Sequence, residues 1–572
     1  MEVSDMDDVI EPFGAGFVTA LAPEFVLVIG LFTLMIVPNL GDAKFRIPLT
    51  QIRIPWLFGG KRGTLDSDPR LPGIFASVFL VMAFVLAFIS FIGGMETKTI
   101  ASGTNELLKV DEFSRLFELI FYGALALASI ASIDRLPATS RKDRSVSGLY
   151  NNRRQVDFYI LLMTCGLGMS VVALAQDMFL LFIGLELASF STYVLVAFMK
   201  ETKEGSEAGM KYFIVGSVAS GVGLYGLSLL YLWAGSLQFE ELTAHFNATG
   251  MDPLPLTALG MLLVGFGFKV SAAPFHFAAP DAYAGAPGPV AGVLATASKA
   301  MGIVGLLRIL LVVASPEGMD DGTTVWLVAL AALSVVTMTW GNLAALGSTN
   351  PKRMLAYSSV AHAGYMLAAI TAIGALNWEA DHADASRTAA LAVVTALMFH
   401  LVVLVCFKLG AFLVLSLLES ENGGHTLESL GGLVKREPFL AVAMFIFMMS
   451  LAGVPPLAGF LSKLLVIMGI VKAALLESGA SGSITFSEIH WVWYLAFIMV
   501  INSAISVFYY LRVGLVMFFN EPEEGREGPL PRGTSVRFAI VACVASTIYF
   551  GIGAGQLIAL CESAANALVG AW

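Results

Sequence analysis

Apolar runs of about 20 residues recur from one end of this 572-residue chain to the other. The hydrocarbon core of a bilayer requires helices of this length, because a helix satisfies its own backbone hydrogen bonds. Hydrophobic residues make up 57% of the chain and charged residues only 13%, against about 25% charged residues in soluble domains. The composition therefore predicts an all-α polytopic membrane protein.

The apolar runs predict about 14 transmembrane helices. They lie near 16–38, 73–95, 112–132, 157–176, 178–199, 209–235, 255–296, 298–314, 323–345, 354–374, 388–418, 438–477, 489–519 and 536–563. Spans 7 and 12 are interrupted, by APFHFAAPDAYAGAPGPV (273–290) and AGVPPLAGF (452–460), because proline removes helical hydrogen bonds. A membrane tolerates such a break only where protein or water satisfies the freed backbone.

Lysine and arginine fall mostly in the loops on one side of these spans. With the N-terminus outside, the inward loops hold 21 of them and the outward segments hold three, Lys98, Lys109 and Arg387. Cytoplasmic loops carry an excess of lysine and arginine, so this split predicts that the N-terminus is outside. The net charge of −10 lies mainly in loops and termini, and it argues against a nucleic-acid partner.

The two interrupted spans are five spans apart, so their helices run in opposite directions. Opposed broken helices are typical of inverted repeats. We expect an N-terminal three-helix flank with basic inward loops over 1–156, a first repeat of spans 4–8 over 157–314, and a second repeat of spans 9–13 over 315–519. An inward loop and the final helix would occupy 520–572.

Nine lysines and arginines fall inside the predicted spans, where a charge at the bilayer centre costs at least about 2.5–3.5 kcal/mol. Four lie near span ends, where a long side chain can reach the interface. We therefore expect snorkelling at Arg115, Arg308, Lys472 and Arg512.

The other buried charges predict proton transfer. Lysine, unlike arginine, can lose and regain a proton when it is buried, and a neighbouring carboxylate such as Glu186 would hold it in the charged form. A single buried pair would merely fix helix packing, but charges spread over both repeats favour a path. Its members are Glu186, Lys211, Lys269, Lys299, His400, Lys408 and Lys463, with His276 and His362 as further relays.

The four cysteines, Cys165, Cys406, Cys543 and Cys561, lie in apolar spans and none shows C-x-x-C spacing. Such cysteines are typical of small buried hydrophobes, and a zinc or iron–sulfur site would need clustered ligands. We expect the chain to bind no metal and no cofactor.

Five blocks carry a resemblance to a known family. They are QDMFLLFIGLELASFSTYVLVAF (176–198), EAGMKYFIVGSVASG (207–221), GFGFKVSAAPFHFAAPDAYAGAPGPVAGVLATASKA (265–300), NPKRMLAYSSVAHAGYML (350–367) and AGVPPLAGFLSK (452–463). The chain resembles the antiporter-like membrane subunits of proton-pumping respiratory dehydrogenases (complex I), and most of all the subunit N type.

The resemblance implies roles for the charged residues. Glu186 would pair with Lys211, and Lys269, Lys299 and Lys463 would carry protons. Lys463 favours the N type, because the M type usually has a glutamate there. One residue departs from the pattern: Lys408 in VCFKLGAFLV (405–414) stands where bacterial N chains usually have a neutral polar residue. It either moves the connecting lysine onto span 11 or marks one lineage, and it points toward an archaeal complex fed by a reduced deazaflavin.

The resemblance also implies a setting. The chain would be a proton-translocating membrane-arm subunit of a respiratory dehydrogenase–quinone (or methanophenazine) oxidoreductase in a prokaryotic plasma membrane. Its partners would be antiporter-like M and small K/J-type subunits and a peripheral redox arm, with iron–sulfur clusters and a flavin in those partners. The alternative is a subunit of a multisubunit cation/proton antiporter, which shares most of these motifs.

Overall fold

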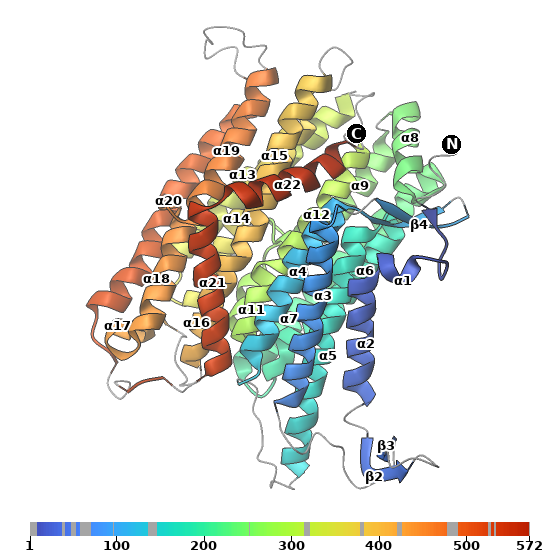
Figure 1. Ribbon diagram of the computed structural model, residues 1–572. Helices are drawn as coiled ribbons and strands as arrows, with labels where there is room; N and C mark the ends of the chain where they lie inside the picture. Colours follow the sequence, from blue (N-terminus) through green and yellow to red (C-terminus); the bar gives the residue numbers. More distant parts are fainter. Residues whose placement is uncertain are drawn as a thin grey trace.

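The computed structural model describes residues 9–36, 40–46, 53–57, 70–94, 97–103, 105–134, 146–250, 252–313, 321–377, 383–419, 426–477, 490–523, 528–530 and 533–570. Within these residues, twelve helical stretches are long and apolar enough to cross a membrane. Three further apolar helices, α2, α18 and α22, have 15 residues each. The molecule is a bundle of long helices (Figure 1).

The helices up to the first break are α1 (Phe17–Ala20), α2 (Ala22–Ile36), α3 (Leu71–Ile92), α4 (Glu112–Ser132), α5 (Val146–Leu174), α6 (Met178–Val196), η4 (Ala197–Met199), α7 (Lys203–Ala234), α8 (Phe239–Thr249) and α9 (Pro253–Val270). Those from the first break to the second are α10 (Ala279–Gly285), α11 (Gly288–Ala295), α12 (Ala297–Val313), α13 (Asp321–Gly347), α14 (Pro351–Gly374), α15 (Ala383–Leu404), the π-helical turn η5 (Val405–Leu409), α16 (Gly410–Glu419), η6 (Glu428–Leu430), α17 (Leu433–Arg436) and α18 (Pro438–Ala452). The chain ends with α19 (Ala458–Glu477), α20 (Trp493–Phe519), α21 (Thr534–Ile552) and α22 (Gly555–Val569).

Both predicted interruptions break the helix. After α9, Ser271 adopts a left-handed conformation with φ of 61°, and the chain turns before α10. After α18, Gly453 does the same with φ of 84°. Side chains satisfy the freed backbone as a membrane interior requires: the N–H of Ala273 donates to Thr337 Oγ1 at 3.0 Å, and the N–H of Gly459 donates to Ser450 Oγ at 3.0 Å.

The final span differs from the prediction of one helix over 536–563, which was wrong. The helix α21 ends at Ile552, and α22 then lies across the bundle (red in Figure 1). Glycines at 551, 553 and 555 weaken the helix at this point. A Cβ atom on Gly551 would lie 2.2 Å from the carbonyl oxygen of Pro456, so this glycine lets α21 approach the second break.

Five short strands add to the helical class that was predicted. In one sheet, β4 (Lys98–Ser102) lies between β1 (Val9–Ile10), which is parallel to it, and β5 (Asn105–Val110), which is antiparallel. The strands β2 (Leu40–Arg46) and β3 (Arg53–Leu57) form an antiparallel pair in the basic segment 39–72. Both sheets lie in segments between the apolar runs, where the hydrophobic periodicity that we used has no signal.

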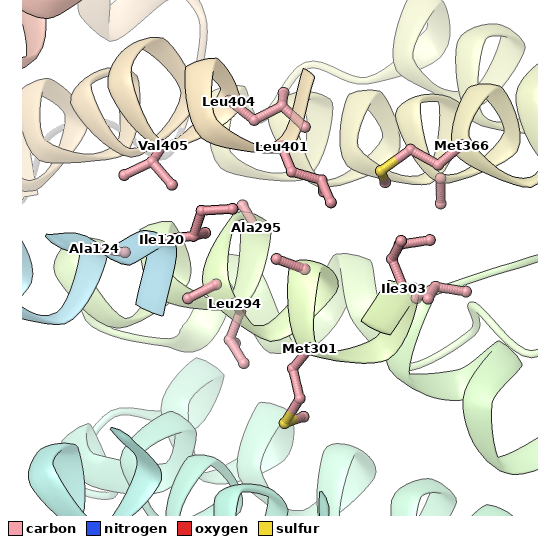
Figure 2. Close-up of a cluster of buried hydrophobic side chains, with 14 of the residues drawn as sticks. Ile120, Ala124, Leu294, Ala295, Met301, Ile303, Met366, Leu401, Leu404 and Val405 are labelled. Carbon is pink, nitrogen blue, oxygen red and sulfur yellow. The ribbon is translucent and has the colours of Figure 1, made fainter. Parts of the chain in front are cut away.

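The core lies where α11 and α12 pack against helices from both sides. Figure 2 shows Leu294, Ala295 and Ile303 of these helices near Ile120 and Ala124 of α4 and below side chains of α14, α15 and η5, with Met301 pointing to the opposite side. Two glycines allow α11 to approach closely: a Cβ atom on Gly288 would lie 2.3 Å from Ser416 Cβ, and one on Gly292 would lie 2.3 Å from Leu409 Cδ1. This contact places α11, which directly precedes the helix of Lys299, against η5 and α16, the segment that carries Lys408.

Candidate proton-conducting site

Lys269 is the second-last residue of α9, directly before the first break. Its side chain is buried, and its Nζ atom has no hydrogen-bond partner among the described residues. The ammonium instead lies 5.1 Å from the centre of the Tyr193 ring and 5.5 Å from that of Phe268. A charge this deep without a salt bridge is costly, and the two aromatic faces together with the charge of Glu186 favour it.

Two other lysines cap the broken helices. Lys299 of α12 donates from Nζ to the carbonyl oxygen of Val270, the last residue of α9, at 2.7 Å. Lys463 of α19 donates to the carbonyl oxygen of Ala452, the last residue of α18, at 3.5 Å. The C-terminal carbonyls of a helix lack partners within the helix and carry partial negative charge, which favours a cation. Both breaks therefore hold an ammonium group.

The two predicted histidines of α14 and α15 contact each other. His362 Nδ1 lies 3.1 Å from His400 Nε2, and the two rings stack with centroids 5.2 Å apart. On its other side, His400 Nδ1 lies 3.1 Å from the hydroxyl of Ser462, the residue before Lys463. Imidazole can accept a proton on one nitrogen and release one from the other, so this row can pass a proton between helices.

Lys408 lies in the π-helical turn η5, a helix irregularity that is frequent at functional sites. The side chain is fully buried, and Nζ donates to Ser358 Oγ at 3.0 Å. The Ser358 hydroxyl also lies 2.5 Å from the Tyr510 hydroxyl. The π turn thus directs Lys408, the residue that departs from the family pattern, toward the hydroxyl groups of Ser358 on α14 and Tyr510 on α20.

Glu186 and Lys211 do not contact each other. Glu186 accepts a hydrogen bond from Ser220 of α7 at 2.6 Å. Lys211 is half-exposed and pairs with Glu207 at 2.6 Å and with Asp281 at 2.7 Å. The predicted carboxylate and lysine lie on neighbouring helices, α6 and α7, but each has other partners in this structure.

Asp281 connects Lys211 to a cavity of about 600 Å³. In addition to Lys211, Asp281 binds Arg353 of α14. The cavity is lined by charged and small polar residues from the start of α7, from α10 and from the α13–α14 junction: Glu204, Glu207, Asp281, Ser348, Asn350 and Arg353. It therefore brings polar groups to the half-exposed Lys211.

His276 lies just after the first break and is buried. Its ring contacts Phe277 at 5.2 Å and Trp340 at 6.1 Å between centroids, and its Nδ1 has no hydrogen-bond partner among the described residues. The structure does not join it to the row formed by His362 and His400.

Two arginines that were expected to snorkel are buried, and that prediction was wrong for them. Arg115 binds Glu118 and the carbonyl oxygen of Ala20, and lies 3.7 Å from Glu24. Glu24 also accepts hydrogen bonds from Tyr122 at 2.9 Å and from Ser170 at 2.6 Å. These residues, Arg115, Glu118, Glu24, Tyr122 and Ser170, form what we call the Arg115 cluster. Because these carboxylates balance its charge inside the protein, Arg115 does not have to extend to the membrane–water interface.

Arg308 is the second exception, and aromatic rings surround it. It binds the carbonyl oxygen of Ala173 and lies over the rings of Phe113 at 5.4 Å and Phe239 at 5.9 Å. Lys472 and Arg512 are exposed on the bundle surface, and their snorkelling stays a prediction.

Comparison with known proteins assigns the family. Residues 175–485 match the family model described as NADH:quinone oxidoreductase/Mrp antiporter, TM. The NADH-quinone oxidoreductase subunit N of Heliobacterium modesticaldum is 36% identical over 496 residues, which are 86% of this chain and 92% of that protein. The chain belongs to the subunit N family of complex I. It is thus a proton-translocating membrane-arm subunit, and a multi-pass membrane protein of a prokaryotic respiratory complex.

Two further relatives agree with this assignment. The F(420)H(2) dehydrogenase subunit N of Methanosarcina mazei is 33% identical over 477 residues, covering 81% of this chain and 86% of that protein. A chain of respiratory complex I from Thermus thermophilus has a TM-score of 0.66 and 29% identity, covering 94% of this chain and 99% of that one. Subunit N works with partner subunits that carry the redox centres. Among the described residues here, no three His, Cys, Asp or Glu side chains gather to hold a metal ion.

Several residues of the site were missed from the sequence. The hydroxyl and carboxylate partners of the predicted residues are Ser220, Asp281, Ser358, Ser462 and Tyr510. Four of them, all except Tyr510, lie inside the blocks that carry the family resemblance. For the three serines this position was a weak signal, because serines within an apolar helix often bond their own backbone.

Proposed function

We propose that the predicted path residues carry the translocated proton through this subunit. They are Glu186, Lys211, Lys269, Lys299, His400, Lys408 and Lys463, with His276 and His362 as further relays. The observation that supports this most directly is the buried row from His362 through His400 to Ser462, which continues to Lys463 on the same helix. Ionisable side chains within membrane-spanning helices are costly to bury, and they mark candidate proton relays.

The row also lies close to the other lysines. His362 interacts electrostatically with Lys408, Lys463 and Lys299, and Lys299 binds the end of the helix that carries Lys269. A proton can therefore step from Lys269 to Lys299, through the histidines, and on to Lys408 or Lys463. His276 and His362 would serve as relays, of which His362 has the closer contacts.

The scale of the energies supports this path. Moving one charge across 100 mV takes about 2.3 kcal/mol. A charge at a helix end gains up to about 2 kcal/mol in partly buried geometries. The two quantities are of similar size, so small movements at the breaks suffice to move a proton from one lysine to the next.

We place the driving movement at Glu186 and Lys211. Ser220 binds Glu186 from α7, and the same helix carries Lys211 with its partners Glu207 and Asp281. A rearrangement in a neighbouring subunit that shifts α7 would exchange these partners and change the charge near Lys269. The cavity beside Asp281 would supply protons from the side of the basic loops.

We also propose a finer architecture for the chain, in which each of the two repeats provides one half of the proton path. The chain would have fourteen spans with the N-terminus outside, a flank over 1–156, inverted repeats over 157–314 and 315–519, and a final part over 520–572. The matching lysine caps of α9 and α18 support the repeats. Part of the basic loop 133–156, at 135–145, lies outside the described residues.

The partners would be M-type and K/J-type membrane subunits and a peripheral arm with iron–sulfur clusters and a flavin. Lys408 supports a donor of the deazaflavin type, as for the relative from Methanosarcina mazei. Comparison of NADH with reduced deazaflavin as donor to the purified complex tests this. Turnover with NADH alone would contradict the deazaflavin assignment.

Replacement of Lys408 by methionine tests the path. We expect proton pumping in proteoliposomes to fall by roughly a hundredfold, the usual contribution of one proton-transfer group, because Lys408 has no adjacent lysine to replace it in η5. Lys472→Met, which changes an exposed lysine, is the matched control and should pump normally. Normal pumping by Lys408→Met in an assembled complex would exclude Lys408 from the path.

A further inference from the structure

We propose that Tyr193 positions the Lys269 ammonium and links its proton affinity to α7. The inference rests on the proposed function, because it assumes that Lys269 carries a proton. Tyr193 lies on α6, seven residues after Glu186, so the two side chains project from about the same face of that helix. Its ring centre is 5.1 Å from Lys269 Nζ, within the range in which an aromatic face stabilises a cation.

Two groups of α6 act on this lysine: the Tyr193 ring, and the carboxylate of Glu186, which attracts it electrostatically; Cys165 of α5 also faces it. Lys269 Nζ makes no hydrogen bond to any described residue, and the other ring near it, Phe268, is its own neighbour in the chain. The Tyr193 hydroxyl is buried and also has no hydrogen-bond partner in the described part of the chain. The side chains of Ser220 and Ser189 lie near this hydroxyl, and the ring face is the part of Tyr193 that is turned to Lys269.

The helix α7 holds the ring in place. A Cβ atom on Gly216 would lie 2.3 Å from the Tyr193 hydroxyl oxygen, so the absence of a side chain at Gly216 makes room for the phenol. The Tyr193 ring also packs edge-on against Tyr212, with centroids 5.1 Å apart. Tyr212 directly follows Lys211 in the chain. A shift of α7 relative to α6 and α9 would therefore move the Tyr193 ring relative to Lys269.

The second half of the chain repeats the arrangement. Lys463 Nζ lies 6.0 Å from the centre of the Tyr365 ring. Tyr365 lies on α14, seven residues after Ser358, as Tyr193 lies seven residues after Glu186. Here the tyrosine hydroxyl has a partner, since Asn342 Nδ2 donates to it at 3.0 Å. Two lysines beside two helix breaks thus each face a tyrosine from a helix of the same half.

The test compares Tyr193→Phe, which keeps the ring, with Tyr193→Leu, which removes it, in the full complex in proteoliposomes. A desolvated cation–π contact favours the charged lysine by roughly thirtyfold. We expect Tyr193→Phe to pump normally. In Tyr193→Leu the neutral amine is favoured, so the alkaline limb of the pumping–pH profile should move to lower pH by about 1.5 units.

Tyr159→Leu is the matched control, because it removes a tyrosine ring that is equally buried, on α5; it should leave the pH profile unchanged. Gly216→Ala provides a second route, since it displaces the ring and keeps both Tyr193 and Lys269. It should shift the profile in the same direction.

A wild-type pH profile in Tyr193→Leu or in Gly216→Ala would overturn the inference, and so would equal damage in Tyr193→Phe and Tyr193→Leu. If Tyr193→Leu does not assemble, Gly216→Ala decides. Failure of the proposed function would look different, because Lys269→Ala would then pump normally.

Discussion

Replacement of Lys269 by alanine is expected to abolish proton pumping while the subunit still assembles into its complex. The side chain is buried at the end of α9, and no hydrogen bond from it holds the fold together. On the proposed path, its loss would remove a proton carrier without breaking a hydrogen bond. Pumping should fall by roughly a hundredfold or more. The measurement is redox-driven acidification in proteoliposomes, with subunit content checked in the purified complex.

A control keeps this result specific. Lys472→Ala removes an exposed lysine near the end of a predicted span, and it should pump as the wild type does. Wild-type proton transport by Lys269→Ala would remove Lys269 from the path. Loss of the subunit from the complex would show instead that the residue is structural.

Replacement of Arg115 by methionine is expected to destabilise the N-terminal flank by about 3–5 kcal/mol, the usual cost of breaking a buried ion pair. Arg115 is the positive charge of the Arg115 cluster, facing the carboxylates of Glu24 and Glu118. Without it, α2 and α4 would enclose two uncompensated carboxylates. The measurement is the thermal unfolding midpoint of the purified complex, together with the amount of subunit that assembles.

The double variant Arg115→Met, Glu118→Leu should recover part of this loss, because it removes one of the two stranded carboxylates. Arg512→Met changes an exposed arginine on α20 and should stay within about 0.5 kcal/mol of the wild type. A midpoint in Arg115→Met no lower than in Arg512→Met would show that the cluster contributes no stability.

The two helix breaks could be predicted from the sequence because their causes are local. Proline and glycine act on the residues beside them, so Pro274 and the pair Pro455–Pro456 mark their own positions. The side chains that satisfy the broken backbone come from elsewhere. Thr337 reaches the first break from α13, and nothing in the sequence near residue 273 indicates that contact.

The site itself was predicted as a set of residues but not as a set of contacts. A lysine or histidine in an apolar run is visible without any structure, whereas its partner depends on packing between helices. Lys211 shows this limit, because it binds Asp281 on α10 and not Glu186. Arg115 shows the opposite case: Glu118 lies three residues away on the same helix face, and that local signal was available.

The lysines that cap α9 and α18 join a chemical quantity to a mechanical one. While Lys299 is charged, its ammonium pulls on the carbonyl end of α9, and Lys463 does the same at α18. Loss of the proton weakens this attraction by up to about 2 kcal/mol. The end of the half-helix would then be held less firmly. By the same reciprocity, a force on the half-helix changes how tightly the proton is held. On the proposed path, each break would thus couple an electrical quantity to a mechanical one. A displacement of the half-helix and the protonation of its lysine would both act through the same hydrogen bond.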